Sequence, residues 1–171
     1  MKKYLILVLV VLLIGALTVG VLAVGKTGQA GKSNIAHLYL HEKDPDTWEI
    51  VPDGAWGKMK YNLSGSTFDF VFNGHDLEIG LEYTLIYYPD PWPGTGLICL
   101  GSGTVNEEGD IHIAESVEIE CLPIEGDEND GAKIWLVLTS DVDCYGQFMN
   151  GWSPDDYLFE YDLITFNAAS E

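Results

Sequence analysis

The sequence predicts an all-β protein, a two-sheet antiparallel β-sandwich of the immunoglobulin-like or jelly-roll type, and three observations lead to this fold class. From Asn34 onward, apolar and polar residues alternate with a period of two, which is the side-chain period of a β-strand. Residues that favour turns, mainly Gly, Pro, Asn and Asp, interrupt this alternation at short intervals. The sequence contains no long stretch with helical periodicity, and "SPDDYL" offers a single helical turn at most.

The first residues are typical of an exported protein. Met1-Lys2-Lys3 precedes an apolar run with no charged side chain up to Gly25, and Val21-Leu22-Ala23 supplies small residues for cleavage. We therefore expect residues 1–23 to be a signal peptide. An uncleaved anchor helix is the alternative, because about 20 apolar residues span a bilayer. Either interpretation places the remaining chain outside the cytoplasm, in the extracellular space or at the cell surface.

The rest of the chain divides into a linker and one domain. Residues 24–33 are rich in Gly, Lys, Gln and Ser and are expected to form a flexible linker. The stretch "GVLAVGKT" fits the pattern of a nucleotide-binding loop, but it spans the expected cleavage site and follows no folded strand, so we exclude a phosphate site there. Residues 34–171 are expected to form the β-sandwich domain around one core.

The expected strands follow one another at short intervals. They cover residues 35–41, 47–51, a hairpin within 56–74, and then residues 82–88, 96–103, 110–119, 133–140 and 157–166. The strands "EYTLIYY" (82–88) and "KIWLVLTS" (133–140) are apolar on both faces, which predicts that they are central strands.

The hairpin within residues 56–74 has the most specific pattern. A two-residue turn at Ser64-Gly65 sets Tyr61 opposite Phe68 on one face. The same register sets Lys60 opposite Asp69 on the other face, so it pairs apolar side chains together and opposite charges together.

Three cysteines and one sequon are meaningful because the chain is expected to be exported. We predict a disulfide between Cys99, in an apolar strand, and Cys144, after a central strand, which leaves Cys121 free. The spacing of the cysteines fits neither a zinc ribbon nor covalent haem. Asn62-Leu63-Ser64 is an N-glycosylation sequon, so Asn62 is a candidate glycosylation site.

The composition excludes one class of partner. The chain has a net charge of −19, with 27 Asp and Glu residues against 8 Lys and no Arg. Such a chain repels nucleic acid and lacks the preferred phosphate-binding side chain, so no nucleic-acid partner is expected. Contact with a membrane is expected only through the N-terminal segment, if that segment is uncleaved.

We expect no cofactor, with calcium as the one candidate ion. Asp141 and Asp143 follow a predicted strand, and Asp155 and Asp156 lie in "SPDD" at the same expected end of the domain. Calcium binds several oxygen atoms from flexible loops, although solvated turn residues are the alternative interpretation. The pair His37 and His41 is not a metal site, because four residues of strand span about 13 Å.

Two loops hold tryptophans that are candidates for ligand binding. Trp92 is flanked by prolines in "YYPDPWPG", and Trp152 lies in "GWSPDD". A tryptophan held in a stiff loop can stack on a sugar or on an aromatic ring of a partner. Packing of either ring onto the edge of its own domain is the alternative.

Three long stretches, "LEYTLIYYPDPWPGTGLICLGSGTVNEEGDIHI", "GAKIWLVLTSDVDC" and "GWSPDDYLFEYDLITF", resemble a secreted domain found in uncharacterised exported proteins of archaea and some bacteria. The resemblance covers the chain from about Ala36 to Phe166. It implies an exported all-β domain, and it brings no established activity and no catalytic residues.

The sequence thus favours a non-catalytic interaction module at the cell surface or in the extracellular space, which binds a protein, a glycan or its own copies. The alternative is a secreted hydrolase that uses paired carboxylates. A pocket with two buried carboxyl groups of raised pKa would favour the enzyme, and exposed tryptophans or an open sheet edge would favour binding.

Overall fold

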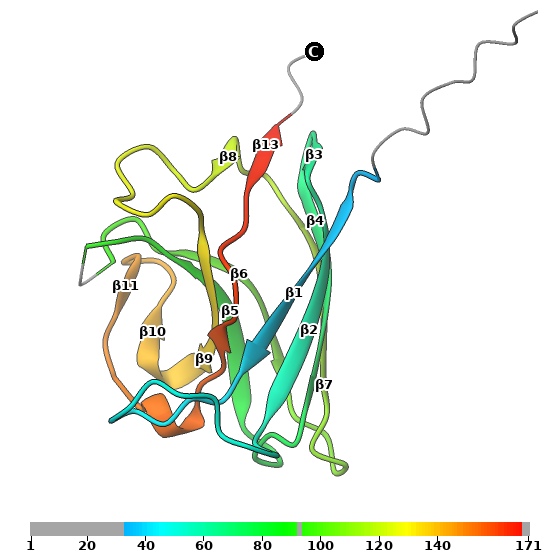
Figure 1. The fold of residues 1–171 in the computed structure, drawn as a ribbon, viewed down its shortest axis with the longest axis vertical. Coiled ribbons are helices and arrows are strands. Elements are labelled where there is room, and N and C mark those ends of the chain that lie inside the picture. Colours follow the sequence, from blue (N-terminus) through cyan, green and yellow to red (C-terminus); the bar gives the residue numbers. More distant parts are fainter. Residues whose placement is uncertain (1–32, 92–93, 169–171) are drawn as a thin grey trace, which may run out of the picture. The chain divides into compact units, whose positions relative to one another are not determined.

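The computed structural model describes residues 33–91 and 94–168, and this part of the chain is all-β with several antiparallel sheets (Figure 1). Its strands are β1 (Ile35–His41), β2 (Trp56–Asn62), β3 (Ser64–Gly65), β4 (Phe68–His75), β5 (Glu82–Tyr88), β6 (Ile98–Thr104), β7 (Ile111–Val117), β8 (Cys121–Leu122), β9 (Lys133–Leu138), β10 (Val142–Asp143), β11 (Phe148–Met149), β12 (Phe159–Glu160) and β13 (Phe166–Ala168). Two short 3-10 turns, η1 (Thr139–Asp141) and η2 (Pro154–Asp156), complete the described elements. The expected helical turn in "SPDDYL" is η2.

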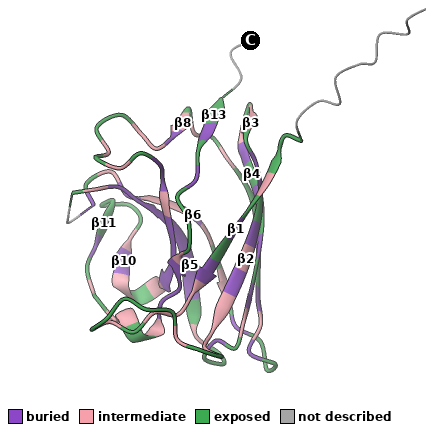
Figure 2. Cartoon of the chain, in the orientation of Figure 1, coloured by how far each residue is buried: buried purple, intermediate pink, exposed green. Residues whose placement is uncertain are grey.

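The largest sheet has five strands in the order β12-β1-β2-β4-β7, and all of its neighbours are antiparallel. Burial alternates strictly along β4, where every second side chain from Phe68 to Gly74 is buried. The buried side chains of β1, β2 and β4 therefore all point to one face of the sheet, as the period of two predicted. Figure 2 shows this alternation along β2 and β4.

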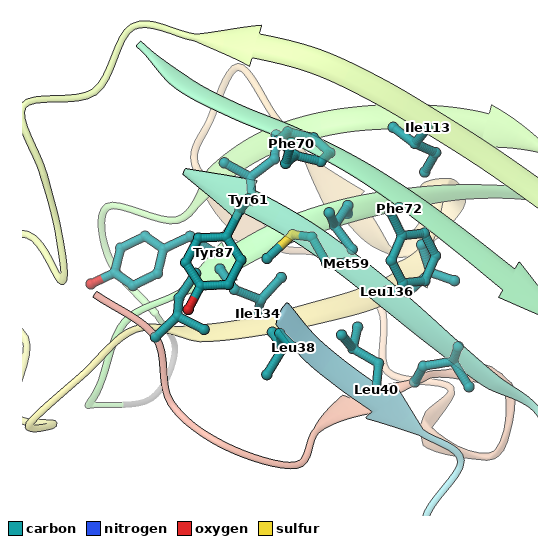
Figure 3. Close-up of a cluster of buried hydrophobic side chains, with 14 of the residues drawn as sticks. Leu38, Leu40, Met59, Tyr61, Phe70, Phe72, Tyr87, Ile113, Ile134 and Leu136 are labelled. Carbon is teal, nitrogen blue, oxygen red and sulfur yellow. The ribbon is translucent and has the colours of Figure 1, made fainter. Parts of the chain in front are cut away.

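The second main sheet, β6-β5-β9, lies over this buried face. Tyr87 of β5 and Ile134 and Leu136 of β9 join Met59 and Phe72 of the five-stranded sheet in one core (Figure 3). This arrangement is consistent with the predicted β-sandwich. The finer assignment to an immunoglobulin-like or jelly-roll topology stays a prediction.

The sheet β6-β5-β9 is buried on both of its faces. Ile86 and Tyr88 of β5 and Trp135 of β9 point away from the main core into a second hydrophobic cluster. That cluster is covered by Val142 of β10 and Tyr157, which come from a third layer of hairpin and loops. The prediction that residues 82–88 form a central strand is confirmed, and β9 is likewise buried on both faces, although it lies at an edge of its three-stranded sheet.

A disulfide joins Cys99 of β6 to Cys144, which follows β10, with a Cα–Cα distance of 5.6 Å. This confirms the predicted pairing, and Cys121 is free. The bond is compatible with an oxidising extracellular environment. Within residues 33–91 and 94–168, the structure contains no helix that is both long and apolar enough to cross a membrane.

The hairpin of β2 and β4 differs from the predicted register by two residues. Tyr61 pairs with Phe70 rather than with Phe68, and Lys60 does not face Asp69. A shift of two residues keeps every side chain on its predicted face, so the phenylalanines of β4 are still buried.

The side chain of Asn62 accounts for the shift, because it closes a wider turn than the predicted one. Its Nδ2 donates to the carbonyl oxygen of Thr67 (2.9 Å), and its Oδ1 accepts from the backbone N–H of Asp69 (2.8 Å). Ser64-Gly65, the predicted two-residue turn, instead forms β3, which pairs in parallel with β13.

Two other strand predictions were wrong. Residues 47–51 form no strand, and the chain there makes a turn with a single bridge between Lys43 and Ile50. Residues 157–166 are divided between β12, at the edge of the five-stranded sheet, and β13, in the small sheet β3-β13-β8. The predicted signal peptide, and the predicted linker up to residue 32, lie outside the described residues.

Candidate ligand cleft

Aromatic side chains from separate parts of the chain line a cleft of about 560 Å³ on the outer side of the sheet β6-β5-β9. We call it the aromatic cleft, and its described lining residues are Trp48, Tyr88, Asp90, Lys133, Trp135 and Trp152. Two of the six are a carboxylate and an ammonium group, and the other four are aromatic.

The floor of the cleft is made by Tyr88 and Trp135. Both side chains point away from the main core, because they alternate with the core residues of β5 and β9. Their rings stack with centroids 4.2 Å apart and an interplanar angle of 12°. They are 2% and 7% exposed, so packing against the domain fixes the position of the floor.

Trp48 is presented to the cleft by a tightly bonded turn. Asp44 accepts from the backbone N–H groups of Asp46 and Thr47 through Oδ1 and from the N–H of Trp48 through its carbonyl oxygen (2.8 Å). The bond from the Thr47 N–H is the largest of the contacts that hold the pKa of Asp44 below its usual range. The turn holds Trp48 at a φ of 59°, a left-handed conformation that is uncommon for a bulky residue. The indole is 50% exposed and lies edge-on to Phe159, with ring centroids 5.1 Å apart.

Trp152 lies in the loop between β11 and η2, beside Tyr157. The two rings are T-shaped with centroids 5.5 Å apart, and the centroid of Trp135 lies 6.1 Å from Trp152. The Tyr157 hydroxyl donates to Oδ2 of Asp141 (2.5 Å) and accepts from the backbone N–H of Ser153 (3.1 Å). Burial, and then the bond to Asp141, raise the pKa of Tyr157, so this hydroxyl keeps its proton and holds the loop next to Trp152.

A charged pair gives the cleft a polar side. The Nζ atom of Lys133 lies 2.5 Å from Oδ1 of Asp90 and 5.0 Å from the ring centroid of Tyr88. This position satisfies the ammonium group with both a carboxylate and a ring face. Asp127 accepts from the backbone N–H of Asp90 (3.1 Å) and from the hydroxyl of Tyr87 (2.5 Å), which positions the loop that carries Asp90.

Glu160 lies behind the floor and is a second acid near the cleft. Its carboxylate accepts from Nε1 of Trp135, and burial raises its pKa. Glu160 therefore orients the indole of Trp135, whereas Asp90 is bonded to Lys133. Among the described lining residues Asp90 is the one carboxylate, and Glu160 is not among them, so the described cleft does not present the two carboxyl groups that a glycosidase uses.

The structure places Trp152 in this cleft, whereas Trp92 lies outside the described residues. The sequence reasoning missed Trp48, Tyr88 and Trp135 as site residues. Trp48 was assigned to a strand that does not form, and the other two belong to strands that were correctly expected to be apolar on both faces. The outward aromatic positions of those two strands are the sequence feature that could have indicated the cleft.

The four aspartates proposed for calcium do not converge. Asp141 accepts from Tyr157, and Asp143 accepts from the backbone N–H groups of Tyr145 (3.0 Å) and Gly146 (2.8 Å) in its own turn. Asp155 and Asp156 line a separate hollow of about 170 Å³. Among the described residues, no group of His, Cys, Asp and Glu side chains is arranged to hold a metal ion.

The candidate glycosylation site, Asn62, is buried, with 7% of its surface exposed. Its Nδ2 atom donates to the carbonyl oxygens of Thr67 and Ser64. A glycan would take one of these two donor hydrogens and the space next to them, so the folded turn disfavours modification here.

Comparison of the chain with protein-family models, curated proteins and solved structures found no match.

Proposed function

We propose that this protein is an extracellular, non-catalytic binding module that takes a glycan in the aromatic cleft. The observation that carries this proposal is the combination of two half-exposed tryptophans, Trp48 and Trp152, with a charged pair in one cleft. A sugar ring has apolar C–H faces that stack on indole rings and hydroxyl groups that bond to carboxylate and ammonium groups.

The construction of the cleft supports a binding role. The floor rings are fixed by burial, and each wall tryptophan is held by a hydrogen-bonded loop from a different part of the chain. Such a rigid site loses little conformational entropy when a ligand binds. The volume of about 560 Å³ is within the range of small-ligand sites.

The charge of the protein favours a neutral glycan over an anionic one. The net charge of −19 repels anions, and the one lysine of the cleft is already paired with Asp90. We therefore expect uncharged hexose-containing oligosaccharides to bind better than uronates or sulfated sugars.

Glycan-array screening at pH 7.5, followed by titration calorimetry with the best oligosaccharide, tests the proposal. Trp48→Ala and Trp152→Ala should each weaken binding about 5- to 150-fold, taking for a sugar the 1–3 kcal/mol, roughly, that stacking of a nucleic-acid base on one aromatic ring contributes. Trp56→Ala is the matched control, because Trp56 packs beside His75 on the far face of the five-stranded sheet, with ring centroids 4.7 Å apart. Binding that is equal in all three variants, or an array without a ligand, would refute the proposal.

The same samples test the hydrolase alternative. The bound oligosaccharide should be recovered intact after prolonged incubation with the protein, as measured by mass spectrometry. Shortened products that disappear in an Asp90→Asn variant would replace the binding module with an enzyme.

A further inference from the structure

All four histidines of the chain lie on the solvent-facing side of the five-stranded sheet. We call this side the outer face, and it consists of the outward-pointing residues of β1, β2, β4 and β7. Its histidines are His37 and His41 on β1, His75 on β4 and His112 on β7. The strands were predicted from their periodicity, but the gathering of the histidines becomes visible only when the register of the sheet is known.

The register sets the basic residues of the outer face side by side. One row across the sheet runs His37, Lys60, Val71, Ala114, and the next runs Tyr39, Lys58, Asn73, His112. Rows on one face of a sheet are about 7 Å apart, and neighbouring strands are about 4.8 Å apart. The two lysines and two exposed histidines therefore occupy a patch about 14 Å wide.

Acidic residues are nearly absent from the same positions. Of the 27 acids in the chain, only Asp69 occupies an outward position in the described strands of the outer face. Asp69 is at the end of β4 and accepts from the hydroxyl of Thr67 (2.7 Å). Other acids border the face. Asp110 pairs with His75, and Glu115 lines the same hollow as Lys60 and Asp69. Glu42, Asp76 and Glu118 directly follow β1, β4 and β7. A chain with net charge −19 thus presents one face whose outward strand positions hold two lysines and four histidines against one acid, and this face gains positive charge when the histidines are protonated.

The outer face also exposes apolar side chains. Ile35, Tyr39 and Val71 are 41%, 42% and 38% exposed, and Lys58 lies over the ring of Tyr39 at 5.4 Å. Aromatic side chains are enriched in protein–protein interfaces, so the exposed Tyr39 and its apolar neighbours favour a protein partner. A surface that binds a polyanion, such as an acidic polysaccharide, consists mainly of positively charged groups and does not require these exposed apolar side chains.

The opposite side of the same molecule has the complementary charge. The connection between β8 and β9 contains Glu125, Glu128 and Asp130, all exposed, and no lysine before Lys133. The β10–β11 hairpin lies on that side too and exposes Tyr145 completely. In Figure 1 these two segments lie at the left, and β2, β4 and β7 lie at the right.

We propose that the outer face docks the acidic side of a second copy of this chain, and that the association strengthens when the histidines are protonated. Joining two different surfaces gives a head-to-tail assembly, which can extend beyond a dimer. Both exposed histidines take part directly. His37 has Lys60 as its cross-strand neighbour, so an acid of the partner that docks there lies beside two basic groups, and His112 bonds to Asn73 (2.8 Å).

The other two histidines contribute less. His75 already has an acidic partner, because its Nδ1 lies 2.8 Å from Oδ1 of Asp110. His41 is half-buried beside Tyr161, and burial together with the charge of Lys43 lowers its pKa. The pH dependence therefore depends mainly on His37 and His112.

Sedimentation velocity of the purified exported protein at pH 7.5 and pH 5.5 tests the proposal. The association constant should rise at least tenfold toward pH 5.5, where histidine is protonated and most carboxylates are still charged. Addition of 0.5 M NaCl should reverse most of this rise, because salt screens charge pairs on a surface. His37→Gln combined with His112→Gln should remove the pH dependence without changing the melting temperature.

Charge exchange distinguishes head-to-tail contact from other modes of association. Lys58→Glu with Lys60→Glu damages the outer face, and Glu125→Lys with Glu128→Lys damages the acidic side. Each double variant should be monomeric alone at pH 5.5, and a mixture of the two should form dimers through their intact surfaces. Lys26→Glu with Lys32→Glu, which makes the same change in net charge outside the outer face, should associate as the unaltered protein does.

Three results would overturn the proposal. The protein could be monomeric at both pH values, or the two double variants could still associate alone. Alternatively, the monomeric protein could bind alginate or dextran sulfate at pH 5.5 through the same lysines, which would assign the outer face to an anionic polysaccharide.

Discussion

The Asn62→Ala substitution tests the reasoning about the β2–β4 turn, because the one buried side chain of Asn62, at the end of β2, forms hydrogen bonds with the backbone at the start of β4. Asn62 donates to the carbonyl oxygen of Thr67 and accepts from the N–H of Asp69, at 2.9 and 2.8 Å. A third contact, to the carbonyl oxygen of Ser64, is longer at 3.3 Å. Alanine removes all three and leaves the backbone groups of Thr67 and Asp69 without these partners.

The expected loss of stability follows from the two short bonds. Each contributes about 1 kcal/mol net in a folded protein, so Asn62→Ala should lower the free energy of unfolding by about 2 kcal/mol. In a domain of this size, that loss corresponds to a fall in the melting temperature of about 6 °C. Urea denaturation of the purified protein measures the first quantity, and calorimetry measures the second.

Asn62→Asp makes the test more specific. The introduced carboxylate can still accept from the N–H of Asp69, but it faces the carbonyl oxygens of Thr67 and Ser64 without a hydrogen to donate. Folding should therefore raise the pKa of the introduced carboxyl group. The loss of stability in Asn62→Asp should be complete above this raised pKa and should decrease as the pH falls below it toward 4. Asn73→Ala, at an exposed position of β4, is the control and should change stability by less than about 0.5 kcal/mol. A loss below this limit in Asn62→Ala, or a pH-independent loss in Asn62→Asp, would refute the turn mechanism.

Three further predictions concern the disulfide, calcium and a buried tyrosine. Replacing Cys99 and Cys144 by alanine should cost about 4 kcal/mol in urea denaturation, because the bond closes a loop with a sequence separation of 45, and an unchanged midpoint would contradict this. Melting temperatures in excess calcium and in chelator should coincide at matched ionic strength, since the carboxylates of Asp141 and Asp143 already have other partners; a calcium-dependent rise lost in their asparagine variants would restore the metal site. Burial raises the pKa of Tyr83 to about 12, above its unfolded value near 10, so the contribution of this tyrosine to stability should be full below pH 10 and be lost between pH 10 and 12, which the pH-dependent difference in the free energy of unfolding between the protein and a Tyr83→Phe variant measures.

The fold was largely predictable because it depends on a local property, the alternation of apolar and polar residues. Phe68, Phe70 and Phe72 specify one buried face of β4 wherever its partner strand lies. The apolar side chains on both faces of β5 likewise required a layer on each side. The disulfide followed from the same reasoning, because Cys99 and Cys144 each adjoin one of the layered strands.

The errors come from side chains that act on the backbone of the turns. Asn62 changed the register by two residues, and no hydrophobic pattern contains that information. Asp44 bonds to three groups of the next residues and turns "TWEIV" away from a strand. The cleft was unpredictable for a related reason: the turn formed by Asp44 places Trp48 in the cleft, and the hydrophobic pattern does not contain this turn.

The burial of β6-β5-β9 on both faces also explains how one small domain can hold two separate surfaces. The third layer, which contributes Tyr157 and covers one side of Trp135, carries the loop of Trp152, so the aromatic cleft is built on that layer. The outer face is on the other side of the main core, with both sheets between it and the cleft. Lys58 of the outer face lies over the ring of Tyr39, whereas Trp48 packs on Phe159 and Trp152 packs on Tyr157. Energetic coupling between two sites requires a connected set of side chains that can adopt two different arrangements. The tightly packed core between the outer face and the cleft holds its side chains in one arrangement. Substitution of Lys58 and Lys60 on the outer face is therefore expected to leave glycan binding in the cleft unchanged.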